Sequence, residues 1–379
     1  MRLLYLTRTY TRHDARWLRV LAEQGLVLGF LPLQAVPSGD FAREHPSVEL
    51  LASPGLPAGA DTAQLDAAKP QVRAQGDAWQ PDVILAGPLT DAGYLAARID
   101  AGRTLLMSWA FDVLHEPEVS VGAKERLRDV LGRGRHLFTD CQALADQCES
   151  QVGRKYENLC VLPWGLAAED KPAPRSGRRQ QLGDEAARVI LYTRGSDPVH
   201  QPQTVVEAFR RARAQDDTLC LWLAGAGLRE RFELIVEASG LRPAVRFLGY
   251  LDQAELAACF MEADAYLACS LSDGSSISLL QAMHAGLPCI VSDLPGNREW
   301  VGSGGGWLVP AGQPEAFARA LVESGGLSAD AHARIAAHNR LRVNQRADLS
   351  ANLPRLLRTL RAIAGRSQPV ATEPLSLAL

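Results

Sequence analysis

The sequence has few lysines, little net charge, no paired cysteine motif and no long hydrophobic run. Only four of its 40 basic residues are lysines, an excess of arginine that a GC-rich genome produces without any functional cause. The formal net charge of −3 at pH 7 excludes a chain-wide attraction to nucleic acid or anionic lipid. No stretch approaches the roughly 18 consecutive apolar residues that a membrane helix needs. We therefore expect a globular protein with local binding sites.

The seven cysteines lack the C-x-x-C and Cys/His spacings of redox and metal sites. Most lie in apolar runs, such as residues 219–221 and 289–291, where a thiol behaves as a small hydrophobe. Free thiols in odd number favour a reducing compartment, so we predict a cytoplasmic protein. The apolar start of the chain breaks at Thr7 and Arg8 and has no cleavage site, which predicts a strand rather than a signal peptide.

The length of 379 residues suggests two or three domains, at roughly 100 to 200 residues each. Short apolar runs alternate with helical stretches from the start of the chain. Strands are predicted at 3–7, 26–33, 82–86, 104–108, 136–139 and 159–163, and helices at 15–23, 92–98 and 124–131. This alternation predicts a parallel sheet covered on both faces.

A polar stretch at 169–184, rich in proline and charge, is typical of an interdomain linker. The alternation then restarts, with strands predicted at 189–193, 219–224, 245–248, 265–269 and 289–292 and helices at 204–213, 228–238, 254–262, 277–285 and 349–363. We therefore predict an α/β protein. Its predicted parts are an N-terminal domain at 1–165, a linker at 166–187, a C-terminal domain at 188–347, a helix at 348–366 and a tail at 367–379.

Ligands of doubly wound sheets bind outside the carboxyl ends of the strands, so loops that follow strands carry the most information. The segment 270–283 combines a strand end, a polar turn containing glycine, and a helix. Such a turn would aim backbone N–H groups and serine hydroxyls at one point, with the helix dipole behind them, which suits a phosphate. An ordinary capped helix is the alternative.

Residues 273–299 resemble the signature of the retaining GT-B glycosyltransferases of family 4, the glycosyl transferases group 1. That signature has an acidic residue at the start of the turn, a glutamate eight positions later, then Ala-Met and Gly-x-Pro. The resemblance places Asp273 by the donor sugar as a catalytic and donor-binding residue. It assigns sugar and phosphate to the turn formed by Gly274, Ser275, Ser276 and Ile277. Gln281 takes the place of the glutamate that binds the ribose hydroxyls.

Two other loops of the second domain resemble the same family. Arg194 matches an arginine that neutralises the donor diphosphate, which gives it a catalytic and donor-binding role, and His200 lies near the place of an expected lysine. A solvent-exposed loop histidine is the alternative for His200. Gly249 and Tyr250 follow a strand after which the family's backbone faces the nucleotide base.

The N-terminal domain offers fewer candidates. Trp109 and Asp112 follow a predicted strand where relatives face the sugar and the acceptor, and we predict a catalytic or acceptor-positioning role for Asp112. His13 and Asp14 follow the first strand and are the other acceptor-side candidates. Helix capping is the alternative for both aspartates.

The resemblance implies the GT-B fold, two Rossmann-like domains with doubly wound parallel sheets that face each other across a cleft, and a final helix that packs back on the N-terminal domain. It implies a hexosyltransferase that moves a sugar from a UDP- or GDP-sugar to an acceptor hydroxyl with retention, in glycan, glycolipid or glycoconjugate synthesis. We expect no metal and no cofactor, since no Asp-x-Asp or His cluster is present in the expected spacing.

The expected partners are the nucleotide-diphosphate sugar and a sugar, lipid-linked or other hydroxyl acceptor, without nucleic acid. Peripheral membrane association is left open. A catalytically degenerate sugar-nucleotide-binding protein and a GT-B epimerase are the alternatives, the first because Gln281 and the missing lysine depart from the family pattern.

Overall fold

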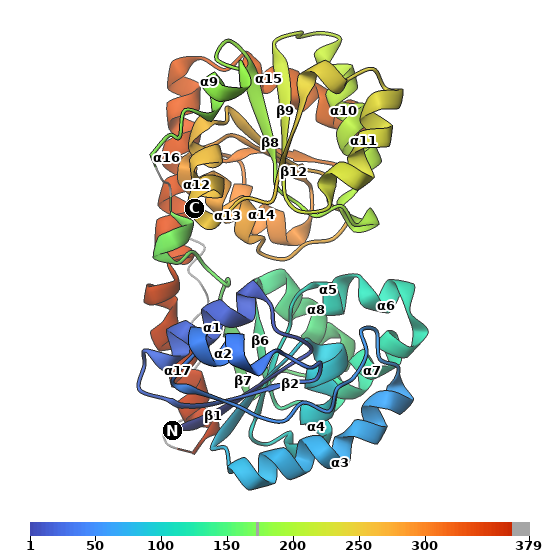
Figure 1. Ribbon diagram of the computed structural model, residues 1–379, viewed down its shortest axis with the longest axis vertical. Helices are drawn as coiled ribbons and strands as arrows, with labels where there is room; N and C mark the ends of the chain where they lie inside the picture. The colour runs from blue at the N-terminus through green and yellow to red at the C-terminus, as the bar shows by residue number, and fades with distance from the viewer. Residues whose placement is uncertain (172–173, 366–379) are drawn as a thin grey trace. The chain divides into compact units, whose positions relative to one another are not determined.

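The computed structural model describes residues 1–171 and 174–365 (Figure 1). Contacts between Cα atoms divide the chain into two compact units. Unit 1 comprises Met1–Leu162 and the segment that begins at Leu353, and unit 2 comprises Pro163–Asn352. The predicted tail at 367–379 lies outside the described residues.

Unit 1 is built on a seven-stranded sheet with the order β3-β2-β1-β4-β5-β6-β7, and every strand pair in it is parallel. The strands are β1 Arg2–Thr7, β2 Val27–Pro32, β3 Val48–Leu50, β4 Val83–Gly87, β5 Thr104–Met107, β6 His136–Thr139 and β7 Asn158–Val161. The order reverses between β1 and β4, which makes their carboxyl ends the switch point where doubly wound sheets bind ligands.

The helices of unit 1 are α1 Arg12–Ala22, α2 Ser38–Glu44, α3 Thr62–Trp79, the π-helix η1 Leu89–Gly93, α4 Tyr94–Asp100, α5 Phe111–Leu114, α6 Glu116–Val119, α7 Val121–Arg133 and α8 Gln142–Val152. The final helix, α17 Leu349–Ile363, joins this unit from Leu353 onward. Its buried stripe of Leu353, Leu356, Leu357 and Leu360 follows the predicted spacing. Thr359 of α17 contacts the buried thiol of Cys160 on β7.

Unit 2 has a six-stranded sheet with the order β10-β9-β8-β11-β12-β13, again parallel throughout. The strands are β8 Arg188–Tyr192, β9 Leu219–Ala224, β10 Val245–Gly249, β11 Ala265–Ala268, β12 Cys289–Ser292 and β13 Gly306–Val309. The helical segments are η2 Ala168–Asp170, α9 Arg178–Leu182, η3 Pro198–His200, α10 Pro202–Arg213, α11 Leu228–Ala238, η4 Arg242–Ala244, α12 Gln253–Glu262, α13 Ile277–Ala285, α14 Pro295–Val301, α15 Pro314–Gly325 and α16 Ala329–Arg346. The switch point of this sheet lies between β8 and β11.

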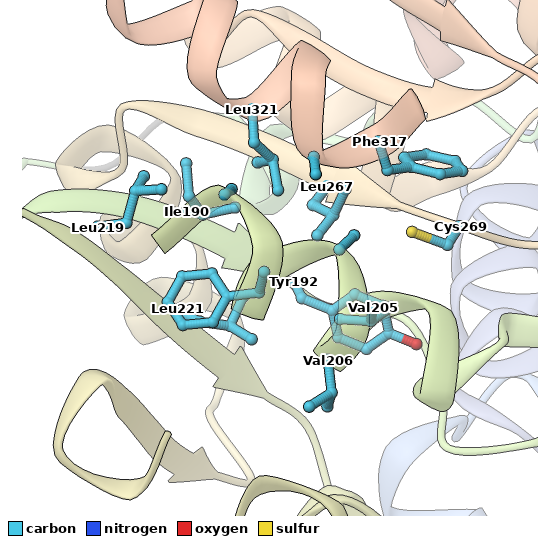
Figure 2. Packing of buried hydrophobic residues seen from close by; sticks show 14 of the residues in the cluster. Ile190, Tyr192, Val205, Val206, Leu219, Leu221, Leu267, Cys269, Phe317 and Leu321 are labelled. Carbon is cyan, nitrogen blue, oxygen red and sulfur yellow. The ribbon is translucent and has the colours of Figure 1, made fainter. Parts of the chain in front are cut away.

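Alternate residues of the unit 2 strands enter two different cores. Ile190 and Tyr192 of β8 pack with residues of α10 and α15, including Val205 and Phe317 (Figure 2). Leu191, between them in sequence, packs in a second cluster on the opposite side, with residues of α12 and α13. The sheet is therefore covered on both faces, as the near-continuous apolar strands predict.

Every strand predicted from the sequence is present, but β3 and β13 and several helices are not among the predicted elements. The described part of the predicted linker also has a structural role in unit 2. Asp184 is buried there, and its carboxylate accepts a hydrogen bond from the indole Nε1 of Trp222, at 2.8 Å, and pairs with Arg246, at 2.6 Å. These contacts attach the segment to β9 and β10.

Candidate functional site

The loops after β8 and β11 diverge at the switch point of unit 2 and carry the polar residues predicted to bind a phosphate. Arg194 follows β8 by two residues, and the turn of residues 269–276 joins β11 to α13. Within this turn Gly274, Ser275 and Ser276 are buried. The topology therefore brings together two segments that are about 80 residues apart in sequence.

Arg194 points at the N-terminus of α13. Its Nη1 donates to the hydroxyl oxygens of Ser276, at 2.6 Å, and Ser278, at 3.3 Å. Its Nη2 lies 3.0 Å from Oδ2 of Asp273. Burial raises the pKa of Asp273 above its ordinary value, and the positive charge of Arg194 opposes that shift. A guanidinium and the first-turn N–H groups of a helix thus converge on one place, the arrangement that binds a phosphate.

The turn is held in shape from the side of α14. The hydroxyl oxygen of Ser275 accepts a hydrogen bond from Nε1 of Trp300, at 2.8 Å, so this predicted ligand is engaged in holding the loop. A Cβ added to Gly296 would lie 2.8 Å from the backbone oxygen of Gly274, so the start of α14 packs directly on the turn. The half-buried Ile277 begins α13.

Ser278 is a site residue that sequence reasoning missed. Its hydroxyl oxygen accepts a hydrogen bond from the phenol of Tyr266, at 2.9 Å, and lies 2.9 Å from that of Ser276. The signal available in the sequence was a third serine, two residues after the turn ends at Ser276. The three hydroxyl groups form a polar chain from the β11 core to the guanidinium of Arg194.

His200 lies at the end of η3, beside the turn. Its Nδ1 is 3.0 Å from Oγ of Ser270, the second residue after β11. The carbonyl oxygen of the neighbouring Val199 accepts the N–H of Leu271, at 2.8 Å. These two contacts hold the β8 loop against the β11 turn. His200 therefore lies against the same turn that Arg194 contacts.

The residues predicted for the nucleoside end lie on the adjoining elements. Gly249 closes β10 with φ of +68°, and its carbonyl oxygen accepts the N–H of Gly225, at 2.8 Å. Tyr250, the next residue, is exposed. Gln281 lies buried on α13, with its Nε2 3.5 Å from Oδ1 of Asp170. Asp170 is a second residue that the sequence did not single out.

In unit 1, Asp112 is fully buried and both its oxygens are engaged. Oδ2 accepts the N–H of Leu89, at 2.6 Å, and Oδ1 accepts the hydroxyl of Ser108, at 2.8 Å, and the N–H of Trp109, at 3.0 Å. These bonds hold the loop in which Ala110 has φ of +63°. Burial raises the pKa of Asp112 to about 7. This geometry is that of the structural alternative, a carboxylate that organises the start of α5.

Asp14 also has a structural role. It is the third residue of α1 and forms a capping box with Thr11, and its Oδ1 accepts the phenol of Tyr5, at 2.7 Å. The N-cap of α1 is therefore Thr11, whereas the sequence reading offered Asp14 itself as the cap. The neighbouring His13 is exposed on α1. Trp109 is half-buried, with its ring 6.3 Å from that of Phe111 in an edge-to-face arrangement.

A third group of residues that the sequence reasoning missed lies at the switch point of unit 1. Arg8 follows β1 and pairs with Asp91 of η1 and, at 2.7 Å, with Glu116 of α6. The guanidinium also lies over the ring of Phe111, 5.3 Å from its centroid. A lone arginine after a strand gave no signal in a sequence with so many arginines, and only the topology brings the two carboxylates to it.

A family model matches part of unit 2. Residues 187–324 match the family model described as glycosyl transferases group 1. This match lies within unit 2. The predicted resemblance is thereby confirmed for this part of the chain.

Curated relatives of this chain align with it over less than half of their own length. The phosphatidyl-myo-inositol mannosyltransferase of Mycobacterium leprae is 36% identical over 164 residues, which is 42% of this chain and 42% of that protein. The D-inositol 3-phosphate glycosyltransferase of Streptomyces griseus is 28% identical over 190 residues, 45% of this chain and 40% of that protein. The chain thus spans less than half the length of the curated relatives that it matches.

Solved structures resemble the whole chain and confirm the predicted fold class, the two Rossmann-like domains of the GT-B fold. The sucrose-phosphate synthase of Thermosynechococcus elongatus has a TM-score of 0.80 at 17% identity and covers 97% of this chain and 100% of that one. HepE of Anabaena in complex with UDP-glucose has a TM-score of 0.75 at 18% identity and covers 96% of this chain and 100% of that one.

Two kinds of feature are absent from the residues that the structure describes. Across 1–171 and 174–365, no group of three or more His, Cys, Asp or Glu side chains is placed to hold a metal ion. Within the same ranges, no helix combines the length and apolar character that a bilayer crossing requires.

Proposed function

We propose that this chain is a retaining glycosyltransferase that moves a sugar from a UDP- or GDP-sugar to an acceptor hydroxyl, in glycan, glycolipid or glycoconjugate synthesis. The observation that carries the proposal is the contact of Arg194 with Asp273, Ser276 and Ser278 at the N-terminus of α13. This contact lies at the switch point of the group 1 domain, where an anionic ligand is expected.

In the proposed reaction the bond between the anomeric carbon and the diphosphate oxygen breaks, and its electron pair leaves with the diphosphate. Arg194 and the first-turn N–H groups of α13 stabilise the negative charge that develops there, a contribution that preorganised donors make without rearranging. The acceptor oxygen bonds to the anomeric carbon on the face that the diphosphate leaves, and its proton passes to the departing phosphate oxygen. No metal ion is needed in this scheme.

Asp273 is proposed to bind hydroxyl groups of the donor sugar. Its carboxylate lies 3.0 Å from Arg194, so it lies beside the place where the diphosphate and the sugar that it carries are proposed to bind. His200, fixed by Ser270, is proposed to donate a hydrogen bond to the same diphosphate. Gly249 and Tyr250 are proposed to face the base.

For the acceptor side we propose unit 1, with Trp109, His13 and the Arg8 group of residues. An arginine, two carboxylates and an aromatic ring are the chemistry that binds a polyhydroxylated acceptor, and relatives are named for inositol-containing acceptors. Asp112 acts in this proposal through the loop that it holds. Membrane association through a lipid-linked acceptor is part of the same proposal.

We also propose that the reaction takes place in a reducing compartment such as the cytoplasm. All seven cysteines are buried free thiols, and such thiols persist where disulfide formation is disfavoured.

Thermal unfolding with UDP, GDP, UDP-glucose and GDP-mannose at millimolar concentration tests the donor site. We expect one nucleoside diphosphate and its sugar to raise the melting temperature, and slow hydrolysis of that sugar nucleotide without acceptor. The anomeric configuration of the released or transferred sugar, followed by NMR, tests retention. If none of the four compounds stabilises the protein, the proposed donor site is wrong. Binding without hydrolysis or transfer would instead support the alternative of a degenerate sugar-nucleotide-binding protein.

A further inference from the structure

The ribose end of the proposed donor site contains an amide where the resembling family has a carboxylate. Gln281 lies on α13, one turn beyond the phosphate-binding residues, and is buried. A neutral amide oxygen is a weaker acceptor for a ribose hydroxyl than a carboxylate oxygen. The structure, however, places a carboxylate directly behind this amide.

That carboxylate belongs to Asp170 of η2, which is 7% exposed. Its Oδ2 accepts the N–H of Ala167, at 2.8 Å, and its Oδ1 accepts Nε2 of Gln253, at 2.8 Å. The same Oδ1 lies 3.5 Å from Nε2 of Gln281. All three groups are donors, so they fit the ionised carboxylate, which can only accept.

Asp170 lies where a residue that supports ribose binding would be expected. Gln253 begins α12, four residues after Gly249 and its proposed contact with the base. Gln281 lies five residues after Ser276 and the proposed phosphate contacts. A nucleotide carries its ribose between base and phosphate, and Asp170 contacts the elements on both sides, α12 through Gln253 and α13 through Gln281.

The carboxylate also fixes which way the Gln281 amide faces. Because Asp170 cannot donate, the amide must turn its N–H toward Asp170, and the carbonyl Oε1 at the other end of the planar group points away from it. A negative charge behind the N–H polarises the amide and makes Oε1 a stronger acceptor.

We infer that Asp170 and Gln281 together perform the ribose-binding role of a single carboxylate, with Gln281 accepting a ribose hydroxyl and Asp170 acting as its positioning residue. This inference rests on the proposed function. It assigns the missing negative charge to a residue outside the family signature, so Gln281 is no sign of a degenerate site.

The inference also reverses the expected effect of a glutamate at position 281. A glutamate carboxylate there would lie close to the carboxylate of Asp170, about 3.5 Å away as the amide nitrogen is now, and like charges at that distance repel. Glutamate can work at 281 only if the charge at 170 is removed. Exchanging the two groups, in D170N/Q281E, keeps one amide and one carboxylate in the pair.

The test measures dissociation constants by calorimetry for the nucleoside diphosphate that binds, UDP or GDP, and for its 2′,3′-dideoxyribose analogue. In the wild type we expect the ribose form to bind more tightly. D170N should weaken binding of the ribose form about tenfold, the loss of one charge-assisted hydrogen bond, and leave the dideoxy form nearly unchanged. Q281E should also weaken the ribose form, and D170N/Q281E should restore it to within about threefold.

The matched control is Q253A, which removes the 2.8 Å partner of Asp170 but leaves the contact with Gln281. It should retain the preference for ribose, whatever it does to the melting temperature. The inference is overturned if D170N keeps the wild-type preference, or if Q281E alone binds the ribose form more tightly. The second result needs no folded D170N protein. If the wild type binds neither UDP nor GDP, the proposed function fails and this inference with it.

Discussion

Arg194 is the side chain on which the proposed chemistry depends most directly, and R194A should separate phosphate binding from nucleoside binding. Its guanidinium donates to Ser276, at 2.6 Å, and has Asp273 3.0 Å away. Removing it deletes the charge-assisted bonds to a diphosphate and leaves the Asp273 carboxylate to repel the ligand. We expect affinity for the nucleoside diphosphate to fall by about 10- to 100-fold, with little change for the nucleoside.

Calorimetric titration of both ligands checks this, with R194K as the control. Lysine keeps the charge but loses the planar fork, so it should recover only part of the affinity. Equal losses for diphosphate and nucleoside would mean that Arg194 supports the whole loop rather than the phosphate.

Asp112 makes stability depend on pH in a direction that can be worked out. Burial raises its pKa to about 7, whereas an aspartate in the unfolded chain titrates near ~3.9. Between these values the folded state holds a proton that the unfolded state has released, so this group's contribution to stability falls as pH rises. The slope reaches about 1.4 kcal/mol per pH unit, and the loss is complete above the folded pKa.

D112N removes that titration. The asparagine keeps one oxygen for Ser108 and Trp109 but leaves the N–H of Leu89 without its acceptor, which costs about 1–3 kcal/mol. Urea unfolding at pH 5, 6, 7 and 8 should show the wild type as the more stable protein at pH 5, with the difference narrowing toward pH 8. A constant difference across this range would contradict the raised pKa.

Among the helices and turns, the packing of α14 on the β11 turn should be sensitive to a single methyl group. A Cβ at Gly296 would lie 2.8 Å from the backbone oxygen of Gly274 and 3.1 Å from that of Asp273. G296A must therefore shift the turn that aims at the phosphate. We expect a lower melting temperature and at least about tenfold weaker nucleoside diphosphate binding, since small displacements of aligned donors are costly.

G76A provides the control. Gly76 lies inside α3, and a Cβ there would meet nothing within 4 Å, so alanine should stabilise the helix by about 0.5–1 kcal/mol. Nucleotide binding should not change. Wild-type affinity in G296A would show that the turn tolerates displacement and is not a preorganised phosphate site.

The same elements show how far the sequence alone can predict this protein. Strands such as β8 and β11 are runs of apolar residues buried on both faces, and a local pattern is enough to find them. The short edge strand β3, Val48–Leu50, lacks such a run. Helix α3 spans 18 residues with Pro70 inside it, which weakens the helical pattern although Asp61 and Gln64 form a capping box at its start.

The site divides in the same way. Arg194, Asp273 and Gln281 lie in segments with a distinctive local pattern, so the sequence alone predicts them as candidates. Ser278, Asp170 and Arg8 acquire their partners only from the order of the strands, and that order is a property of the whole sheet. Asp112 is buried and both of its oxygens accept hydrogen bonds within the fold, which distinguishes it from a reactive carboxylate. The residue type alone does not reveal this burial.

At the level of the whole molecule, the two units are linked through α17, which follows unit 2 in the chain and completes unit 1 from Leu353 onward. Leu356 and Leu360 are fully buried there, and Thr359 contacts the thiol of Cys160 on β7. The core of unit 1 is therefore completed by residues that follow unit 2 in the chain. Truncation before Leu349 should expose that core and destabilise the protein, and a point mutation gives the same test in the full chain.

L356A should cost about 2–5 kcal/mol through the cavity it leaves, whereas L341A, at a side chain that is 58% exposed on α16, should stay within about 0.5 kcal/mol of the wild type. Calorimetric unfolding with and without the bound nucleoside diphosphate shows which of the two units L356A destabilises. Since the ligand is proposed to bind unit 2, L356A should lower the unfolding temperature of a transition that the ligand shifts little, while nucleotide affinity is retained. If L356A lowers the nucleotide affinity together with the unfolding temperature, the two units unfold as one. In that case α17 couples the core of unit 1 to the donor site.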